Sequence, residues 1–217
     1  MAELTLFFIY AAAFIWIFLL AEFSYRKLKL DTECTRKIVH LGTGTIVLTA
    51  PYYGASIRIA LGLTILFTII FLIAKKLKMF PAIYNIERES IGELLFAWSS
   101  FFLFALYKYT GNVWYFYVPF SMVVYADAAS ALVGKFFPLR NFYYINEHKS
   151  YGGSCAFFVV SFALSYYFFS KMKISHILAY SFMNAFILTL VEAFSKKGWD
   201  NLFISVVSVI ILHFITH

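Results

Sequence analysis

The run VWYFYVPFSMVVYADAASALV, residues 113–133, carries one acidic residue, Asp127, inside sequence that is otherwise almost entirely apolar. A run of this length can cross a bilayer as an α-helix. An ionisable side chain at membrane depth is costly unless it is paired, binds a metal or faces a polar cavity. The run therefore predicts a membrane helix and, at Asp127, a functional site. The plainer alternative for Asp127 is a structural hydrogen bond to a neighbouring helix.

The composition of the whole chain agrees with a membrane location. Of its 217 residues, 62% are hydrophobic and 13% are charged, and the mean hydropathy is +0.79. Soluble domains are about one quarter charged. Lipid cannot satisfy free backbone groups, so only helices or closed barrels cross it. Because the apolar runs are long and continuous rather than alternating, we predict an all-α, polytopic transmembrane helix bundle.

About eight apolar segments follow one another along the chain. They cover residues 4–23, 38–55, 57–74, 94–110, 113–133, 154–170, 174–194 and 201–216. The first lacks a basic start and a cleavage site, so we expect a retained helix and not a signal peptide. The sequence PYYG at residues 51–54 predicts either a tight external turn or the bend of a re-entrant hairpin. With no internal repeat or linker, residues 1–217 are predicted to form a single integral membrane domain.

Basic residues indicate the orientation of this bundle. If eight helices alternate from an outside N-terminus, the loops at residues 24–37, 75–93, 134–153 and 195–200 face the cytosol. These loops carry 14 of the 18 Lys and Arg, as the positive-inside rule expects. Topology therefore explains the net charge of +7, and we expect no nucleic acid partner. Cys34 and Cys155 both fall on the cytosolic side, where we expect free thiols.

The loop after residues 113–133 has the composition of a phosphate site. It begins at Gly134-Lys135, contains Arg140, Glu147 and His148, and ends in the turn KSYGGS, residues 149–154. We expect this turn to enter a helix, whose amides and positive end can receive phosphate oxygens. It is not a Walker A loop, since no Gly-x-x-x-x-Gly precedes the Lys-Ser pair.

Three further polar clusters fall on the same predicted side. The segment RKIVHLGTG, residues 36–44, opens the second helix with two cations and places His40 and Gly44 on one helical stripe. Membrane anchoring, with His40 as a hydrogen-bonded interhelical residue, is the plainer interpretation of this segment. The segment RESIGE, residues 88–93, reads as a capping box from Ser90 to Glu93, although Glu89 and Glu93 could also hold a cation together.

The last cluster, EAFSKKGWDN, spans residues 192–201. Glu192 lies near the inner end of the seventh apolar run, and Asp200 and Asn201 open the eighth. Asp or Asn at a helix start is also an ordinary N-cap, so this cluster alone does not decide between a cap and a ligand.

Together the four clusters predict a nucleotide-dependent reaction on a lipid. Four carboxylates, Glu93, Asp127, Glu192 and Asp200, are all placed near the inner interface. Mg²⁺ takes oxygen ligands and usually keeps substrate phosphates in its shell. The cations that would complement a polyphosphate are Arg36, Lys37, Lys135 and Lys149.

At these residues the sequence resembles the family of dolichol kinases, phytol kinases and CTP-dependent diacylglycerol kinases, which is related more distantly to phosphatidate cytidylyltransferases. The resemblance extends from Arg36 to Asn201. Its matching pieces are Arg-Lys-x-x-His-x-x-x-Gly at residues 36–44, Gly-Glu at 92–93, Asp-x-x-Ala/Ser-x-x-x-Gly at 127–134, Lys-Ser-x-x-Gly-Ser at 149–154, Glu192, and Gly-x-Asp-Asn at 198–201.

The resemblance implies transfer of the γ-phosphate of CTP, with ATP possible, to the hydroxyl of a membrane-embedded alcohol. Phosphoryl transfer needs mainly positioning and charge stabilisation. We expect Asp127 to act as metal ligand or base and Lys149 to assist catalysis. Phosphate contacts are expected from Arg36, Lys37, Lys135, Lys149, Ser150, Gly152 and Gly153, Mg²⁺ contacts from Asp127, Glu93, Glu192 and Asp200, and secondary contributions from His40 and Asn201.

Two features of the chain qualify this expectation. Phe137-Pro138 follows Gly134 where the family often has a second glycine, which bears on the loop and on nucleotide choice. The compact length is closer to phytol kinase-like members, which favours a prenyl alcohol of modest length. Three other classes stay open, namely a cytidylyltransferase acting on a lipid phosphate, a transporter, and a structural membrane protein that would tolerate Asp127→Asn.

Overall fold

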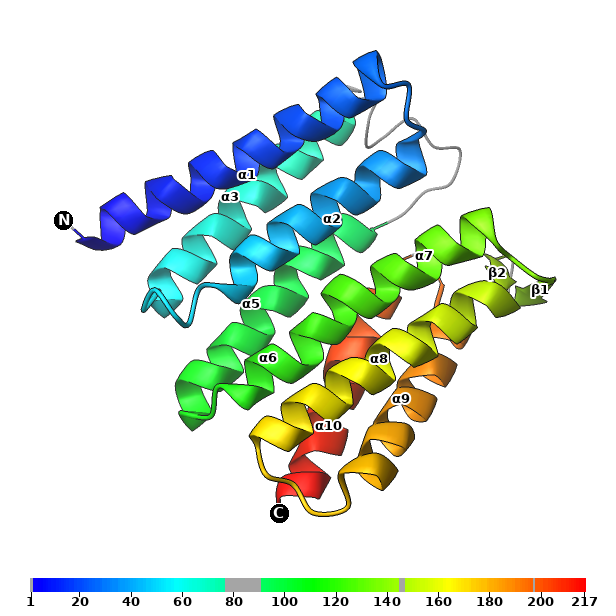
Figure 1. Cartoon of the computed structure of the whole chain (residues 1–217). Helices are drawn as coiled ribbons and strands as arrows, with labels where there is room; N and C mark the ends of the chain where they lie inside the picture. The colour runs from blue at the N-terminus through cyan, green and yellow to red at the C-terminus, as the bar shows by residue number, and fades with distance from the viewer. Residues whose placement is uncertain (1, 77–90, 145–146, 197) are drawn as a thin grey trace.

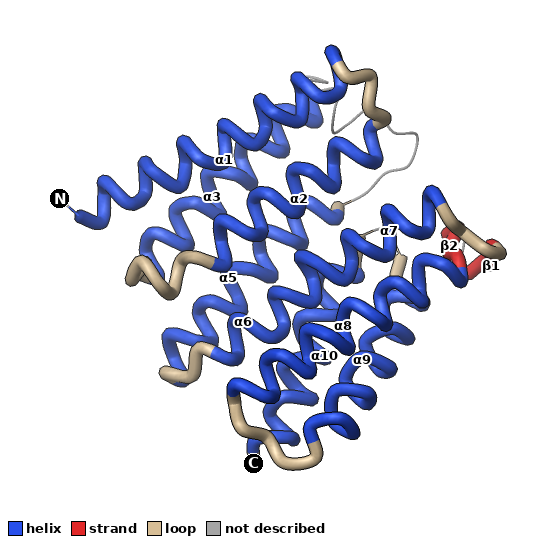
Figure 2. Tube along the Cα trace, viewed as in Figure 1, coloured by secondary structure: helices blue, strands red, loops and turns tan. Residues whose placement is uncertain are grey.

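The computed structural model describes residues 2–76, 91–144, 147–196 and 198–217, and within them each of the eight predicted apolar runs contains a helix (Figure 1). The elements are α1 (Ala2–Lys27), α2 (Thr32–Leu48), α3 (Ile57–Lys76), α5 (Gly92–Thr110), α6 (Trp114–Ser121), the π-helical turn η1 (Met122–Ala126), α7 (Asp127–Phe136), β1 (Asn141–Tyr144), β2 (Glu147–Ser150), α8 (Tyr151–Lys171), α9 (Ile177–Phe194) and α10 (Asp200–Thr216). The predicted all-α bundle is confirmed. In the described part of the chain, the short antiparallel hairpin β1–β2 is the one sheet (Figure 2).

Five of the helical stretches are long and apolar enough to cross a membrane. They are Glu3–Lys27, Ile57–Lys76, Trp114–Phe136, Tyr151–Lys171 and Ile177–Phe194, and α10 is a shorter apolar helix. The protein is therefore an integral membrane protein. The helices α2 and α5 fall outside this set, and both carry charged residues in their first turns or shortly after.

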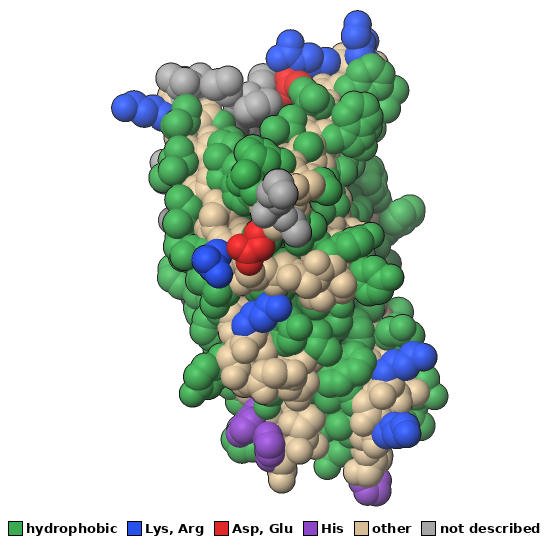
Figure 3. Space-filling view, turned by 90° about the vertical axis from the view of Figure 1, so that its left-hand side faces the viewer, with side chains coloured by type: hydrophobic (Ala, Val, Ile, Leu, Met, Phe, Trp, Pro, Cys, Tyr) green, Lys and Arg blue, Asp and Glu red, His purple; other side chains and the backbone are tan. Residues whose placement is uncertain are grey.

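The helices lie side by side and alternate in direction (Figure 1). One end of the bundle gathers the ends of α1, α3, α7 and α9 and the starts of α2, α5, α8 and α10. We call it the basic end, because the helix ends that flank the predicted basic loops lie there. The opposite end holds both chain termini and the turns after α2, α5 and α8. Figure 3 views the left-hand side of Figure 1, where charged side chains are sparse and hydrophobic side chains predominate.

The connection between α2 and α3 is a tight turn at the end opposite the basic end. The amide of Gly54 donates to the carbonyl of Pro51 at 3.2 Å, and Ala55 donates to Ala50 at 3.0 Å. Gly54 has a φ of +67°, a left-handed conformation that glycine adopts without steric cost. Helices α2 and α3 precede and follow these residues, so the predicted tight turn is confirmed.

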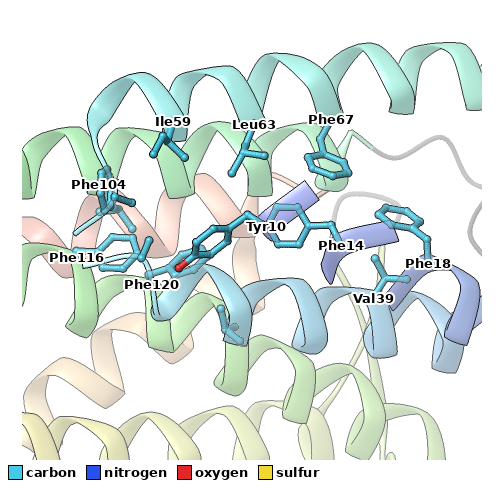
Figure 4. Close-up of a cluster of buried hydrophobic side chains, with 14 of the residues drawn as sticks. Tyr10, Phe14, Phe18, Val39, Ile59, Leu63, Phe67, Phe104, Phe116 and Phe120 are labelled. Carbon is cyan, nitrogen blue, oxygen red and sulfur yellow. The ribbon is translucent and has the colours of Figure 1, made fainter. Parts of the chain in front are cut away.

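The stretch α6–η1–α7 is the central segment of the molecule and packs on two hydrophobic clusters. Phe116, Phe120 and Val124 join the cluster built on α1, α2, α3 and α5, part of which appears in Figure 4. Val118 and Val123 join the cluster built on α8, α9 and α10. A helix that is apolar on every face is buried on every face, and this explains why Asp127, at the start of α7, lies inside the bundle.

Candidate active site

A polar cavity of about 520 Å³ opens at the basic end, where residues from seven helices and the hairpin converge. The structure brings nearly all of the predicted site residues to its wall, although they come from distant parts of the chain. Those that line it are Arg36, Lys37, His40, Glu93, Asp127, Lys135, Lys149, Ser150, Gly153, Glu192, Asp200 and Asn201. Gly152 lies beside the wall and does not line it.

Asp127 is paired with a cation of the second helix. The ammonium of Lys37 donates to Asp127 Oδ2 at 2.6 Å, and His40 Nε2 lies 3.8 Å from the same oxygen. The Asp127 side chain is 9% exposed, so the partner compensates a charge that burial would otherwise make costly. The pair connects α2 to the central segment at the edge of the cavity.

The π-helical turn before Asp127 explains how His40 is held. In a regular α-helix the carbonyl of Val123 would accept from the amide of Asp127. Here that amide donates to Met122 instead, one residue further back. The carbonyl of Val123 is thereby released, and His40 Nε2 lies 2.9 Å from it. Such π-helical turns are frequent at functional sites, and this one holds a ring beside the buried carboxylate.

Arg36 makes the second pairing across the cavity. Its guanidinium donates to Glu93 Oε1 at 2.7 Å and also lies 3.6 Å from Glu33 Oε2. Glu93 belongs to the first turn of α5, where a carboxylate is favoured by the positive end of the helix. The predictions of a partnership of Glu89 with Glu93 and of a capping box at Ser90 depend on Glu89 and Ser90, which lie outside the residues that the structure describes.

Lys149 and Glu192 form the third pair. Lys149 Nζ donates to Glu192 Oε1 at 2.6 Å, and the glutamate side chain is 4% exposed. Burial alone would lower the pKa of Lys149, but the carboxylates of Glu192 and Asp200 more than offset this effect and raise its pKa above the usual value. Lys149 is thus a fixed positive charge on the cavity wall.

Asp200 and Asn201 begin α10 and line the same cavity. Asn201 Nδ2 donates to the carbonyl of Gly92 at 2.9 Å and so joins α10 to the start of α5. Asp200 Oδ1 accepts from the amide of Asn201 at 3.0 Å and from neither of the next two amides, so Asp200 does not make the usual N-cap bond. Asn201 therefore positions two helices, while Asp200 faces the cavity.

The predicted turn of residues 149–154 enters α8, as expected, and its amides are engaged inside the protein. Ser150 is the N-cap, and its Oγ accepts from the amide of Gly153 at 3.0 Å. The amide of Gly152 donates to the carbonyl of Pro138 at 3.0 Å. A Cβ on Gly152 would lie 2.0 Å from the carbonyl oxygen of Phe137. In this arrangement the glycines permit close backbone packing, and the side chain of Lys149 carries the charge toward the cavity.

Lys135 lies at the rim of the cavity and forms an ion pair with Asp31. Asp31 is also the N-cap of α2, since its carboxylate accepts from the amides of Glu33 and Cys34. Burial would raise the pKa of Asp31, but the hydrogen bonds from Lys135 and from the amide of Cys34 outweigh it and lower the pKa to about 2. The loop before α2 is thereby connected to the end of α7.

The donor atoms around the cavity have the chemistry that Mg²⁺ prefers, although they are not gathered into a preformed cluster. In the described part of the chain no three His, Cys, Asp or Glu side chains are grouped closely enough to hold a metal. Two buried oxygens, Glu192 Oε2 and Asn201 Oδ1, have no hydrogen-bond partner among the described residues. Hard oxygen donors that leave room for phosphates suit a cation that keeps substrate oxygens in its shell.

Several features of the site do not follow from sequence reasoning. The three ion pairs Arg36–Glu93, Lys37–Asp127 and Lys149–Glu192 were not predicted, because sequence indicates charge but not partner. The hairpin β1–β2 was expected to be a loop. One residue in the sequence could have indicated the irregular helix at the π-helical turn. Pro119 lies inside the apolar run and cannot donate a helical hydrogen bond.

Comparison with known proteins gives one informative similarity and two negative results. The chain is 25% identical to the phytol kinase of Synechocystis sp. (strain ATCC 27184 / PCC 6803 / Kazusa) over 206 residues, which covers 90% of this chain and 84% of that protein. No family model and no solved structure matches the chain. The similarity to a phytol kinase thus extends over most of the chain.

Proposed function

We propose that this protein is a kinase of a membrane lipid alcohol. It transfers the γ-phosphate of a nucleoside triphosphate, CTP in the first place and ATP as the alternative, to the hydroxyl of an isoprenoid alcohol of the phytol, farnesol, geranylgeraniol or dolichol type, or of diacylglycerol. The observation that carries the proposal is the convergence of three cation–carboxylate pairs on one cavity at the basic end of a membrane bundle. The similarity to a phytol kinase supports it.

The cavity has the parts that phosphoryl transfer requires. That reaction depends on positioning and on charges fixed around the transferred group. Arg36, Lys135 and Lys149 are the cations proposed to hold the phosphates, and each is paired with a carboxylate in the structure described here. Phosphate oxygens would take over these charge-assisted bonds when the nucleotide binds.

Asp127 is proposed as the base. The hydroxyl oxygen of the alcohol forms a bond to the γ-phosphorus, while the bond from that phosphorus to the bridging oxygen breaks and its electron pair leaves with the nucleoside diphosphate. The hydroxyl proton passes to the carboxylate of Asp127, which lies in the apolar central segment where a lipid hydroxyl would arrive. Lys37 holds this carboxylate in place through its hydrogen bond.

Magnesium is proposed as the cofactor. Glu192, Asp200 and Glu93 would hold it, with Asn201 beside them. If Asp127 is not the base, it would be a further ligand of the metal. When bound, the metal would neutralise charge on the phosphates of the nucleotide. We also propose that the basic end faces the cytosol. The helix ends that flank the Lys-rich and Arg-rich loops meet at the basic end, and the positive-inside rule assigns such loops to the cytosolic side.

The test is lipid phosphorylation by the purified protein in detergent with Mg²⁺. CTP or ATP labelled at the γ-phosphate is offered against phytol, farnesol, geranylgeraniol, dolichol and diacylglycerol, with Asp127→Asn as the inactive variant. Lys171→Gln, which removes a cation at the opposite end of the bundle, is the matched control. A labelled lipid monophosphate that is lost in Asp127→Asn and kept in Lys171→Gln supports the proposal. Absence of any labelled lipid from folded protein overturns it.

A second nucleotide label separates the two CTP-dependent chemistries. CTP labelled at the α-phosphate leaves the lipid unlabelled in a kinase reaction. Transfer of that label to a lipid phosphate, with release of pyrophosphate, would identify a cytidylyltransferase instead.

A further inference from the structure

A second, apolar cavity of about 90 Å³ lies between α1, α2, α3 and α5. The large side chains around it come from α1, α3 and α5. Figure 4 shows Tyr10 and Phe14 on one side of this space and Ile59, Leu63 and Phe67 on the other. We call this cavity the apolar channel. Its wall is rich in aromatic rings, and its only polar groups among the described residues are hydroxyls.

Those hydroxyls are turned to their own helices, which leaves the surface of the channel apolar. Thr43 donates to the carbonyl of Val39 at 2.6 Å, Thr64 donates to Ala60 at 2.9 Å, and Ser100 donates to Ala97 at 2.7 Å. At the far end, the hydroxyl of Tyr10 is hydrogen-bonded to Thr49 Oγ1 at 2.8 Å. Because each hydroxyl is satisfied internally, the channel offers a hydrocarbon chain a surface without unpaired polar groups.

The apolar channel meets the polar cavity at three shared residues, Thr43, Phe71 and Phe96. The ring of Phe96 lies against that of His40, with centroids 4.2 Å apart. His40 in turn is the neighbour of Asp127 described above. The junction between the two cavities therefore lies beside the carboxylate proposed as the base, which is where the hydroxyl of an acceptor must be.

The dimensions of the channel fit one slender chain. Along α3 its lining runs from Ile59 to Phe71, which is about 18 Å at the rise of an α-helix. Pockets that enclose a whole drug-sized ligand have volumes of about 300 to 1,000 Å³, well above the roughly 90 Å³ of the apolar channel. A long and narrow space of this kind accepts part of a single chain and leaves no room for the paired acyl chains of a diacylglycerol.

We infer that the apolar channel receives the hydrocarbon tail of the acceptor, with the hydroxyl at the junction beside Asp127 and the tail extending toward Tyr10. This inference rests on the proposed kinase function and narrows it. The acceptor is a single-chain isoprenoid alcohol, and the walls formed by α1, α3 and α5 determine which chain lengths are accepted.

The test compares a short and a long acceptor. Ala60 and Ala97 line the channel on α3 and α5, so Ala60→Phe and Ala97→Phe place a ring inside it. We expect the ratio of kcat/KM for geranylgeraniol to kcat/KM for prenol to fall by about tenfold or more in each variant, because the blocked tail loses apolar contact. Ile65→Phe adds a similar ring on a 44% exposed position of α3 outside the channel, and serves as the matched control.

The outcomes separate the two proposals. If the wild-type protein phosphorylates geranylgeraniol but the ratio in both channel variants equals that of Ile65→Phe, the channel assignment is overturned and the kinase function stands. If the wild-type protein phosphorylates no alcohol, the function itself fails.

A binding measurement on the wild-type protein avoids any dependence on the folding of the variants. Geranylgeraniol with a photoreactive diazirine at its tail end is irradiated with the protein, and the labelled peptides are identified. Cross-links near Tyr10 and Ile59 support the assignment. Cross-links confined to outward-facing positions such as Ile65 and Ile69, which are half-exposed, overturn it.

Discussion

Lys37 Nζ lies 2.6 Å from Asp127 Oδ2, although 90 positions separate the two residues in the chain. The pair joins α2 to the central segment and is mostly buried. Removing one member of a buried ion pair leaves the other charge uncompensated and costs about 3 to 5 kcal/mol, whereas replacing both members with apolar residues is often nearly neutral. Stability and catalysis can therefore be separated at this pair.

Lys37→Met alone is expected to lower the thermal stability of the detergent-solubilised protein strongly. The double variant Lys37→Met/Asp127→Leu is expected to recover most of that loss, yet to stay at least about 100-fold less active, since removal of a general base costs on the order of 10² to 10⁴ in rate. Thermal unfolding and lipid phosphorylation are measured on the same samples. A double variant that is stable and as active as the wild type would exclude a catalytic role for Asp127.

His40 is expected to act by positioning. His40→Ala leaves the released carbonyl of Val123 without its partner, and an unpaired buried acceptor costs about 1 to 3 kcal/mol. His40→Gln can still donate from its amide, so it should retain more stability and more activity than His40→Ala. Melting temperatures and kcat of the two variants provide the comparison. Equal losses in both would mean that the imidazole has a role other than this hydrogen bond.

Lys149 is expected to be a constant positive charge for the nucleotide. Its pKa is raised by Glu192 and Asp200, so it stays protonated below its ordinary pKa of about 10.4 and loses its charge only as the pH rises beyond that. The KM for the nucleotide should therefore not rise through deprotonation of Lys149 at any pH up to about 9. Lys149→Gln should raise this KM by about tenfold or more, because a charge-assisted phosphate contact is lost. A rise in this KM below about pH 9 that occurs in the wild type and is absent from Lys149→Gln would contradict this assignment.

Asp31 has two functions that different substitutions separate. Asp31→Asn removes the charge that pairs with Lys135 but keeps a good N-cap for α2, so it should cost less than about 1 kcal/mol for a largely exposed pair. Asp31→Ala also removes the cap and should cost about 1 kcal/mol more. Melting temperatures at pH 7 give both values.

The pH dependence of Asp31 follows from its lowered pKa. A carboxylate whose pKa falls to about 2 on folding stabilises the folded protein above its unfolded pKa of about 3.9. This contribution is lost as the pH falls from there toward 2. The difference in melting temperature between wild type and Asp31→Asn should therefore shrink across that interval, and a difference that grows on acidification would show that the pair is absent in solution.

Two glycine substitutions should have very different costs. Gly152→Ala places a Cβ 2.0 Å from the carbonyl oxygen of Phe137, a backbone atom, so the start of α8 or the preceding segment must move. Gly54→Ala meets no atom within 4 Å and suffers only from its positive φ, which costs about 1 kcal/mol. We expect Gly152→Ala to lower the melting temperature more and to reduce activity, while Gly54→Ala keeps its activity. The reverse order would contradict the close packing at the cavity wall.

The helices and their common basic end could be predicted from sequence because both depend on local composition. Each apolar run is long enough to be recognised as a membrane helix, and the positions of Lys and Arg indicate which helix ends lie on the same side. The same reasoning predicted that Glu93, Asp127, Glu192 and Asp200 lie near one another at the inner interface. Partner choice could not be predicted in this way, since nothing in the segment of residues 36–44 distinguishes Lys37 from Arg36 as the partner of Asp127.

Two details depended on backbone geometry that sequence specifies weakly. The π-helical turn shifts one hydrogen bond by one residue, from Val123 to Met122, and thereby gives His40 its acceptor. The glycines at 152 and 153 were predicted to free their amides for phosphate, whereas their amides bond to Pro138 and Ser150 and their missing side chains permit close packing. Glycine permits both uses, and tertiary packing decides between them.

The central segment has a consequence for how such an enzyme can diversify. It contacts one cluster of helices that surrounds the apolar channel and another, formed by α8, α9 and α10, that carries Glu192 and Asp200. Among the described residues of α1 and α3, Phe71 alone reaches the polar cavity. Sequence drift in these two helices can therefore change the preferred tail while the machinery for the phosphate donor stays intact, so donor and acceptor preferences are free to evolve as separate traits.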